Sequence, residues 1–205
     1  MRFGTQAAVR GRAPVRRLGS RSARGQSLLE FALIFPIVLI LIIGMIEFAF
    51  AFNAILSVNF ASRDAALLAA EAASSAGSDC VILAKIEDDV SVPAKAKQIQ
   101  QVRIFWTDSN GTEKAANVYS RTASTTCTFP DGSTITVPYT ATSVGYPVSA
   151  RCGVIAGCGG SHPGLDTIGV AIHYHHNWIT GIPAVFSWAA IDFTRSNAMR
   201  MEPIL

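Results

Sequence analysis

One long apolar run near the N-terminus dominates the hydrophobic pattern of the chain. The residues from Phe31 to Phe52 carry a single charged side chain, Glu47. As an α-helix this run would be about 33 Å long at about 1.5 Å per residue, which is enough to cross a bilayer core of about 30 Å. Pro36 and Gly44 would weaken a soluble helix, but membrane helices tolerate both. The pattern therefore predicts a single membrane-spanning helix.

The helical pattern continues beyond the apolar run. Asn53 to Ala76 is rich in alanine and contains no proline or glycine, so the helix is expected to extend outward. Its small-residue stripe is expected to pack on the chain's own outer domain, with a subunit interface as the alternative; the stripe comprises Ile55, Val58, Ala65, Ala66, Ala69, Ala73 and Ala76. Ser74 to Asp79 then breaks the helix, with Asp79 as the expected N-cap of a second helix from Cys80 to about Val90.

The rest of the chain alternates between apolar and polar residues, which predicts β-strands. Asp108–Gly111 and Asp131–Gly132 are turn signals between them. The clearest strand places Ile168, Val170, Ile172 and Tyr174 on one face, followed by Trp178. The expected strands are 101–106, 116–121, 134–139, 168–178 and 189–199. Long helices followed by an antiparallel sheet give an α+β fold.

The positive charge is concentrated at the N-terminus. The formal net charge is +3, but the first 24 residues contain seven arginines and no acid: Arg2, Arg10, Arg12, Arg16, Arg17, Arg21 and Arg24. The remainder has ten basic and fourteen acidic residues, a net of −4. A basic, acid-free segment before an apolar run predicts a cytoplasmic N-terminus and an exported C-terminal part. Because the basic charge is not on the folded domain, no nucleic-acid partner is expected.

Three fates are open to the apolar segment. It can be a permanent anchor, a cleaved secretory signal with an A-x-A-like site at Ala49–Ala51, or a twin-arginine signal based on Arg16–Arg17. Apolar cores of signal peptides usually run about 7–15 residues, shorter than this one, which favours the anchor.

Two acids in this segment need an explanation. Ionised carboxylates are costly in hydrocarbon, so Glu30 is expected to have a function, with a simple headgroup position as the alternative. Glu47 follows seventeen residues later, about 25 Å along a helix. We expect Glu47 to be a solvated acid that marks the membrane exit, with a contact to a partner helix as the alternative.

The segment GQSLLEFALIFPIVLILIIGMIEF begins at Gly25 and contains a recognisable motif. Gly25, four further residues and then Glu30 and Phe31 resemble the processing site of type IV pilin-like proteins. More narrowly, the segment resembles the TadE-like segment of pseudopilins of the tight-adherence (Flp) pilus. Pro36, Gly44 and Glu47 also lie where that pattern has them, and the resemblance extends to about Ala70.

The resemblance implies that a prepilin peptidase cuts between Gly25 and Gln26. It divides the chain into a basic leader (residues 1–25), a transmembrane and extended helix (26–76) and an exported domain (77–205). Glu30 would become the fifth residue, one turn from the new terminal amine, which it could neutralise in its own or a neighbouring subunit.

The implied protein is a minor pilin-like subunit of the inner membrane, because major Flp pilins are much shorter than this chain. Its partners would be the peptidase, other pilin or pseudopilin subunits and the pilus assembly machinery. The alternative is an unprocessed, single-pass binding or structural module.

Four cysteines lie in the part expected to be exported, where the compartment is oxidising: Cys80, Cys127, Cys152 and Cys158. Two disulfides with three possible pairings follow. We favour Cys152 with Cys158, which leaves Cys80 with Cys127. A four-cysteine zinc site is the rival, but no C-x2–4-C spacing supports it.

The histidines and the absence of motifs complete the picture. His173 and His175 share one strand face and could hold a metal with a third ligand such as His162, although a polar wet face is the ordinary explanation. His176 is expected to be a hydrogen-bonded histidine on the apolar face. The sequence has no nucleophile elbow, phosphate-binding loop or zinc-protease motif, so we expect no enzyme and no cofactor.

Overall fold

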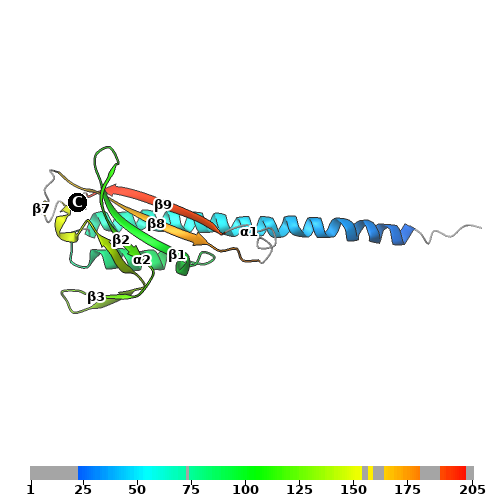
Figure 1. Ribbon diagram of the computed structural model, residues 1–205, viewed down its shortest axis with the longest axis horizontal. Coiled ribbons are helices and arrows are strands. Elements are labelled where there is room, and N and C mark those ends of the chain that lie inside the picture. The colour runs from blue at the N-terminus through cyan, green and yellow to red at the C-terminus, as the bar shows by residue number, and fades with distance from the viewer. Residues whose placement is uncertain (1–22, 73, 154–156, 159–163, 181–189, 202–205) are drawn as a thin grey trace, which may run out of the picture. The chain divides into compact units, whose positions relative to one another are not determined.

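A computed structural model describes residues 23–72, 74–153, 157–158, 164–180 and 190–201, in two compact units, residues 1–42 and 43–205 (Figure 1). The helices are α1 (Ala23–Ala72) and α2 (Ser78–Asp89), with short 3-10 helices η1 (Ala96–Gln98) and η2 (Val148–Ala150). The strands are β1 (Ile99–Thr107), β2 (Glu113–Ser120), β3 (Thr125–Thr128), β4 (Thr134–Val137), β5 (Thr140–Val144), β6 (Cys152–Gly153), β7 (Gly157–Cys158), β8 (Thr167–His176) and β9 (Ile191–Arg200).

The described part of the first unit is the N-terminal portion of α1. Every side chain from Leu28 to Ile42 is exposed, and Pro36 lies inside the helix. Among the described residues, the stretch Gly25–Ala72 is the one helix long and apolar enough to cross a membrane. Its most apolar window is not buried at all, unlike the core helix of a soluble protein. The helix is therefore a candidate membrane anchor.

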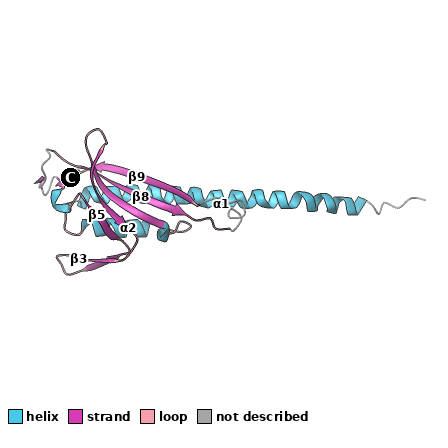
Figure 2. Ribbon diagram, viewed as in Figure 1, coloured by secondary structure: helices cyan, strands magenta, loops and turns pink. Residues whose placement is uncertain are grey.

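The second unit is built on a five-stranded antiparallel sheet in the order β5-β2-β1-β8-β9. The C-terminal part of α1 and α2 lie along this sheet, while β3 and β4 form a separate hairpin (Figures 1 and 2). The predicted α+β fold is confirmed. The small-residue stripe explains how α1 reaches the sheet, because side chains without bulk let a helix approach closely.

The stripe packs in the core of the unit, as predicted. Val58, Ala65, Ala66 and Ala69 are fully buried in one cluster with strand residues, among them Ile104, Val170 and Ile172. Three details differ from the prediction. Ile55 is half-buried and does not belong to this cluster. The helix ends at Ala72, and Ala76 is exposed in the turn that follows; Ala73 lies outside the described residues.

The central strands of the sheet and its edge strand β9 agree with predicted strands, whereas the other edge strand, β5, was not predicted. β1, β2, β4, β8 and β9 match predicted strands, and β9 pairs back on β8 from Thr167–Arg200 to His176–Ile191. The predicted turn at Asp108 is present, with Gly111 at a φ of 78°. Strands β3 and β5 were not predicted, because their threonine-rich sequences lack an apolar face. Strand β8 ends at His176, so Trp178 lies beyond it.

Candidate processing and assembly site

The four residues of the processing motif lie at the start of α1. The peptide bond between Gly25 and Gln26 is in the first helical turns, and the side chains of Gln26, Glu30 and Phe31 are exposed. The Gln26 side-chain amide donates a hydrogen bond to Glu30 Oε1 at 3.2 Å, between residues one turn apart. Phe31 stacks on Phe35 with 5.2 Å between the ring centroids. A carboxylate and an exposed aromatic ring thus follow the Gly25–Gln26 bond by about one turn.

The fold itself does not require glycine at position 25. A Cβ atom added to Gly25 would meet nothing within 4 Å, and its backbone is not among the positive-φ positions. A glycine within a helix costs about 1 kcal/mol relative to alanine, so it weakens this first turn. Gly44 is the same in both respects, since an added Cβ would also meet nothing within 4 Å.

Glu47 is not a solvated acid, and that expectation was wrong. Glu47 is only 3% exposed, and its carboxylate accepts hydrogen bonds from two backbone amides. Ile179 N–H donates to Oε2 at 3.0 Å, and Thr180 N–H donates to Oε1. Both amides lie beyond the end of β8, outside the hydrogen-bonded ladder of the sheet. The carboxylate therefore ties the segment after β8 to α1 within the second unit.

Aromatic contacts surround this connection. The Trp178 ring makes edge contacts with Phe48 of α1, at 6.2 Å between centroids, and with His176, at 5.8 Å. His176 is 4% exposed, and within the described chain neither ring nitrogen has a hydrogen-bond partner. The expected hydrogen-bonded histidine was therefore wrong. Burial lowers the pKa of His176, and the nearby Glu47 carboxylate opposes that change.

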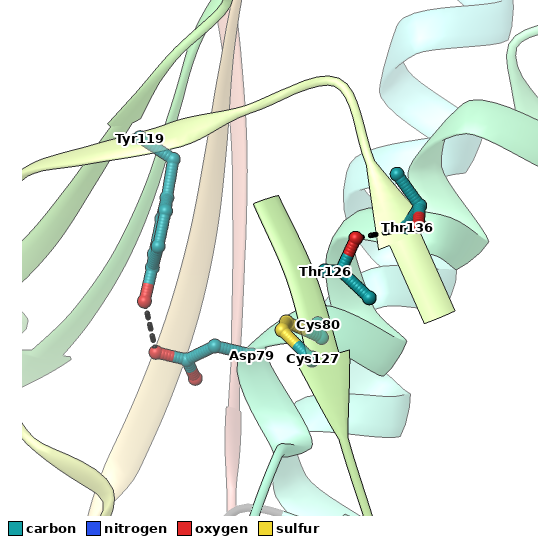
Figure 3. Close-up of a disulfide and its surroundings, with 6 residues drawn as sticks. All are labelled: Asp79, Cys80, Tyr119, Thr126, Cys127 and Thr136. Carbon is teal, nitrogen blue, oxygen red and sulfur yellow. Dashed lines mark hydrogen bonds between the residues drawn. A yellow bond between two sulfur atoms is a disulfide. The ribbon is translucent and has the colours of Figure 1, made fainter. Parts of the chain in front are cut away.

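Asp79 does not cap α2, and that prediction was also wrong. The N-cap is Gly77, in a left-handed conformation and without a side-chain hydrogen bond. Asp79 lies in the first turn and is 8% exposed; its Oδ2 accepts hydrogen bonds from Asn117 Nδ2 at 2.9 Å and from the Tyr119 hydroxyl at 2.5 Å. Figure 3 shows Asp79 pointing to Tyr119. Burial and the Asp79 charge raise the pKa of Tyr119.

A buried arginine completes this network. Arg151 is 1% exposed, and its Nη2 lies 2.6 Å from Asp79 Oδ1. Arg151 Nη1 donates to Ser78 Oγ at 3.1 Å, and the guanidinium carbon lies 4.9 Å from the centroid of the Tyr146 ring. The Tyr146 hydroxyl in turn donates to Asp166 Oδ2 at 2.5 Å. An ion pair with several added hydrogen bonds therefore joins α2, β2 and the segment around η2.

The sequence contains a signal for this arginine, although Arg151 belongs to no motif. Arg151 is the only lysine or arginine between Arg121 and Arg195. A solitary cation in so long a stretch is a candidate for a buried structural pair, because ordinary surfaces carry several scattered charges. The pairing partner, 72 positions earlier at Asp79, has no signal of its own in the sequence.

A disulfide lies beside Asp79. Cys80 on α2 is bonded to Cys127 on β3, with Cα atoms 6.4 Å apart, which is the pairing favoured from the sequence (Figure 3). It joins the β3–β4 hairpin to α2. Cys152 is also in a disulfide, and its backbone lies opposite that of Cys158 in the β6–β7 pair. The side chain of Cys158 lies outside the described residues, so its pairing with Cys152 stays a prediction that this register favours.

His173 and His175 lie on the exposed side of β8 and contact the neighbouring strand. His173 Nδ1 is 3.1 Å from Thr194 Oγ1, and His175 Nδ1 is 2.7 Å from Asp192 Oδ1. Among the side chains that the structure describes, no three histidine, cysteine or acidic residues lie close enough to hold a metal ion. His162 lies outside the described residues. The two histidines therefore take part in cross-strand pairs.

A comparison with known protein families matches most of helix α1. Residues 25–67 match a family model described as TadE-like protein. No curated protein and no solved structure gives a significant match to the chain. The match begins at Gly25, the first residue of the processing motif, and it includes Glu30, Phe31 and Glu47. Residues 25–67 of this chain, which include the candidate membrane anchor, are therefore a TadE-like segment, and the resemblance of the motif is confirmed.

Proposed function

We propose that the chain is a minor pilin-like subunit of a tight-adherence pilus assembly system. The observation that carries the proposal is the TadE-like match, which starts at Gly25 on an exposed apolar helix followed by a folded α+β unit. In this proposal the basic leader stays in the cytoplasm, α1 crosses the inner membrane once, and the second unit is exported. The chain is the substrate of a peptidase rather than an enzyme.

The processing step would be cleavage of the Gly25–Gln26 bond by a prepilin peptidase. Two features support it. Glycine at position 25 has no packing role, and it weakens the helical turn that has to open before the bond can enter a protease site. The hydrolysis leaves the Gly25 carboxylate on the leader and the amine of Gln26 on the mature chain.

The same geometry supports a role for Glu30 after cleavage. The Gln26 side chain already reaches Glu30 Oε1 at 3.2 Å, so the amine created at Gln26 would lie within one turn of the carboxylate. A positive amine and a carboxylate in the first turn stabilise each other and the helix dipole. Paired in this way, Glu30 would remain in an apolar environment at lower cost than alone, and it could equally pair with the amine of a neighbouring subunit.

The fold of the second unit argues against a secretory signal cut at Ala51. Such a cut would sever α1 between Glu47, which binds the segment after β8, and Ala54, which is fully buried in the core. The second unit uses residues on both sides of that site. The partners implied by the proposal are the peptidase, other pilin or pseudopilin subunits and the assembly machinery.

The proposal is tested by co-expression of the full chain with a prepilin peptidase from a tight-adherence system. Intact mass should show loss of residues 1–25 for the wild type and the uncut chain for Gly25→Val. Gly44→Ala is the matched control, because that glycine lies in the same helix and also has no close neighbour. A wild-type chain that keeps Met1 with an active peptidase would contradict the proposal and support an unprocessed, membrane-anchored binding or structural module.

A further inference from the structure

The second unit has an apolar collar around the place where α1 enters it. The collar consists of Met45, Phe48 and Phe52 on α1 and Ile179 after β8. These side chains are 72%, 58%, 65% and 53% exposed, respectively. Exposed apolar side chains that follow one another along about two turns of α1 and the adjoining segment mark a surface that meets an apolar partner.

The two parts of the collar lie at the same level because Glu47 holds them together. Ile179 N–H binds Glu47, the residue next to Phe48, and the Trp178 ring packs on Phe48 itself. Phe48 and Phe52 belong to the last two turns of the apolar run Phe31–Phe52 that predicts the membrane span. The segment 177–180 is thus fixed beside the end of the apolar run and not further along α1.

Backbone hydrogen bonding is what this segment needs in an apolar environment. Non-helical backbone is tolerated at membrane depth only where its polar groups have partners within the protein. The amides of Ile179 and Thr180, which lie outside the sheet, both donate to the buried carboxylate of Glu47. Two hydrogen bonds therefore satisfy both backbone amides and the buried carboxylate of Glu47.

Chemical composition points to lipid as the partner. Trp178 combines a large apolar ring with one N–H donor, the combination that favours the membrane–water interface. The chain carries no charged residue from Asn177 to Ile191. So long an uncharged stretch of sequence fits an apolar environment better than water.

We propose that segment 177–180 rests in the headgroup region of the bilayer leaflet nearest the folded unit, so that the exported domain contacts lipid directly. Glu47 is then a positioning residue that fixes this segment against α1, and Trp178 and Ile179 contact the lipid. The inference rests on the membrane anchoring in the proposed function, but not on cleavage after Gly25.

The test uses the full chain in liposomes of phosphatidylcholine and phosphatidylglycerol. Two variants each keep one tryptophan: Trp178 alone, with Trp106 and Trp188 replaced by phenylalanine, and Trp106 alone as the matched control. Trp106 pairs with Ile168, which lies roughly 26 Å, at about 3.3 Å per residue, from the end of β8 at His176. Quenching by lipids that carry a nitroxide near the headgroup is compared with quenching by aqueous acrylamide.

Trp178 should be quenched by the nitroxide lipid at least about twofold more than Trp106, because only Trp178 lies in the interface. Glu47→Gln in the Trp178-only chain should reduce this quenching, while Glu71→Gln, at an exposed position of the same helix, should not. Equal lipid quenching of the two tryptophans, with Trp178 open to acrylamide, would overturn the inference and leave the collar to a protein partner. A chain that fails to float with the liposomes would contradict the anchoring as well.

Discussion

The substitution Glu47→Gln tests the connection between α1 and the segment after β8. Glutamine keeps the size of the side chain but carries one acceptor oxygen in place of two and no charge. In the wild type both carboxylate oxygens are used, one by the Ile179 amide and one by the Thr180 amide. With the side chain in its wild-type position, the glutamine NH2 group replaces one of these two oxygens, so one of the two amides loses its acceptor.

The size of the effect follows from the hydrogen bonds involved. A hydrogen bond to a charged group contributes about 1.5–3 kcal/mol, so local opening of the segment should become easier by about that amount. Since about 1.36 kcal/mol is a factor of ten in an equilibrium constant, the opening equilibrium should rise roughly 10- to 160-fold. The core cluster of the second unit is not part of this contact, so global unfolding should change less than local opening.

Hydrogen exchange by mass spectrometry on the full chain in nanodiscs measures this opening directly. Exchange at the Ile179 and Thr180 amides should accelerate by the stated factor in Glu47→Gln, while amides in the middle of β8 keep their wild-type rates. Glu71→Gln is the control, since it makes the same chemical change on an exposed face of α1. Unchanged exchange at both amides in a folded Glu47→Gln chain would refute the account of this contact.

Three further predictions concern the stability of the second unit, measured as the thermal midpoint in detergent. Arg151→Met should lower the midpoint by about 6–20 °C, because it leaves Asp79 buried without its cation at a cost of about 3–5 kcal/mol. Adding Asp79→Asn should restore part of that loss. A double variant as unstable as the single one would contradict the pairing. Replacing Cys80 and Cys127 by serine removes a crosslink across 47 residues, which should lower the free energy of unfolding by about 4 kcal/mol. A thermal midpoint within about 2 °C of the wild type would exclude that contribution. Burial lowers the pKa of His176 below its ordinary 6.5, so the unfolded chain binds the proton more readily and stability should fall as the pH drops below about 6.5. His176→Phe should reduce that fall between pH 7 and 5, and an identical pH profile in the variant would count against the buried neutral ring.

Local patterns in the sequence were enough to predict the elements whose residues alternate or repeat. The apolar run, the alanine stripe and the strands at the centre of the sheet all follow from periodicity, which burial on one face imposes. The processing motif could also be recognised, because its glycine, acid and aromatic residue lie within seven consecutive positions. Strand β5 escaped this approach, since four of its five residues are exposed and it has no apolar face.

Long-range polar contacts could not be predicted in the same way. Glu47 was expected in solvent because its distance along the helix from Glu30 places it near the outer membrane interface. Its actual partners are backbone amides 132 and 133 positions later. A backbone donor has no residue identity, so no sequence pattern can reveal it. Asp79 was predicted to be an N-cap because it directly precedes the predicted second helix. Its true partners, Asn117, Tyr119 and Arg151, come close to it only in the folded chain.

The central claim is that the apolar helix is both a cleavage signal and an anchor. Intact-mass analysis of the chain extracted from its native membranes tests it most directly. The account predicts a mature chain that begins at Gln26 and keeps the whole of α1 from that residue onward. A chain that still begins at Met1, or one that begins near Phe52, would contradict it.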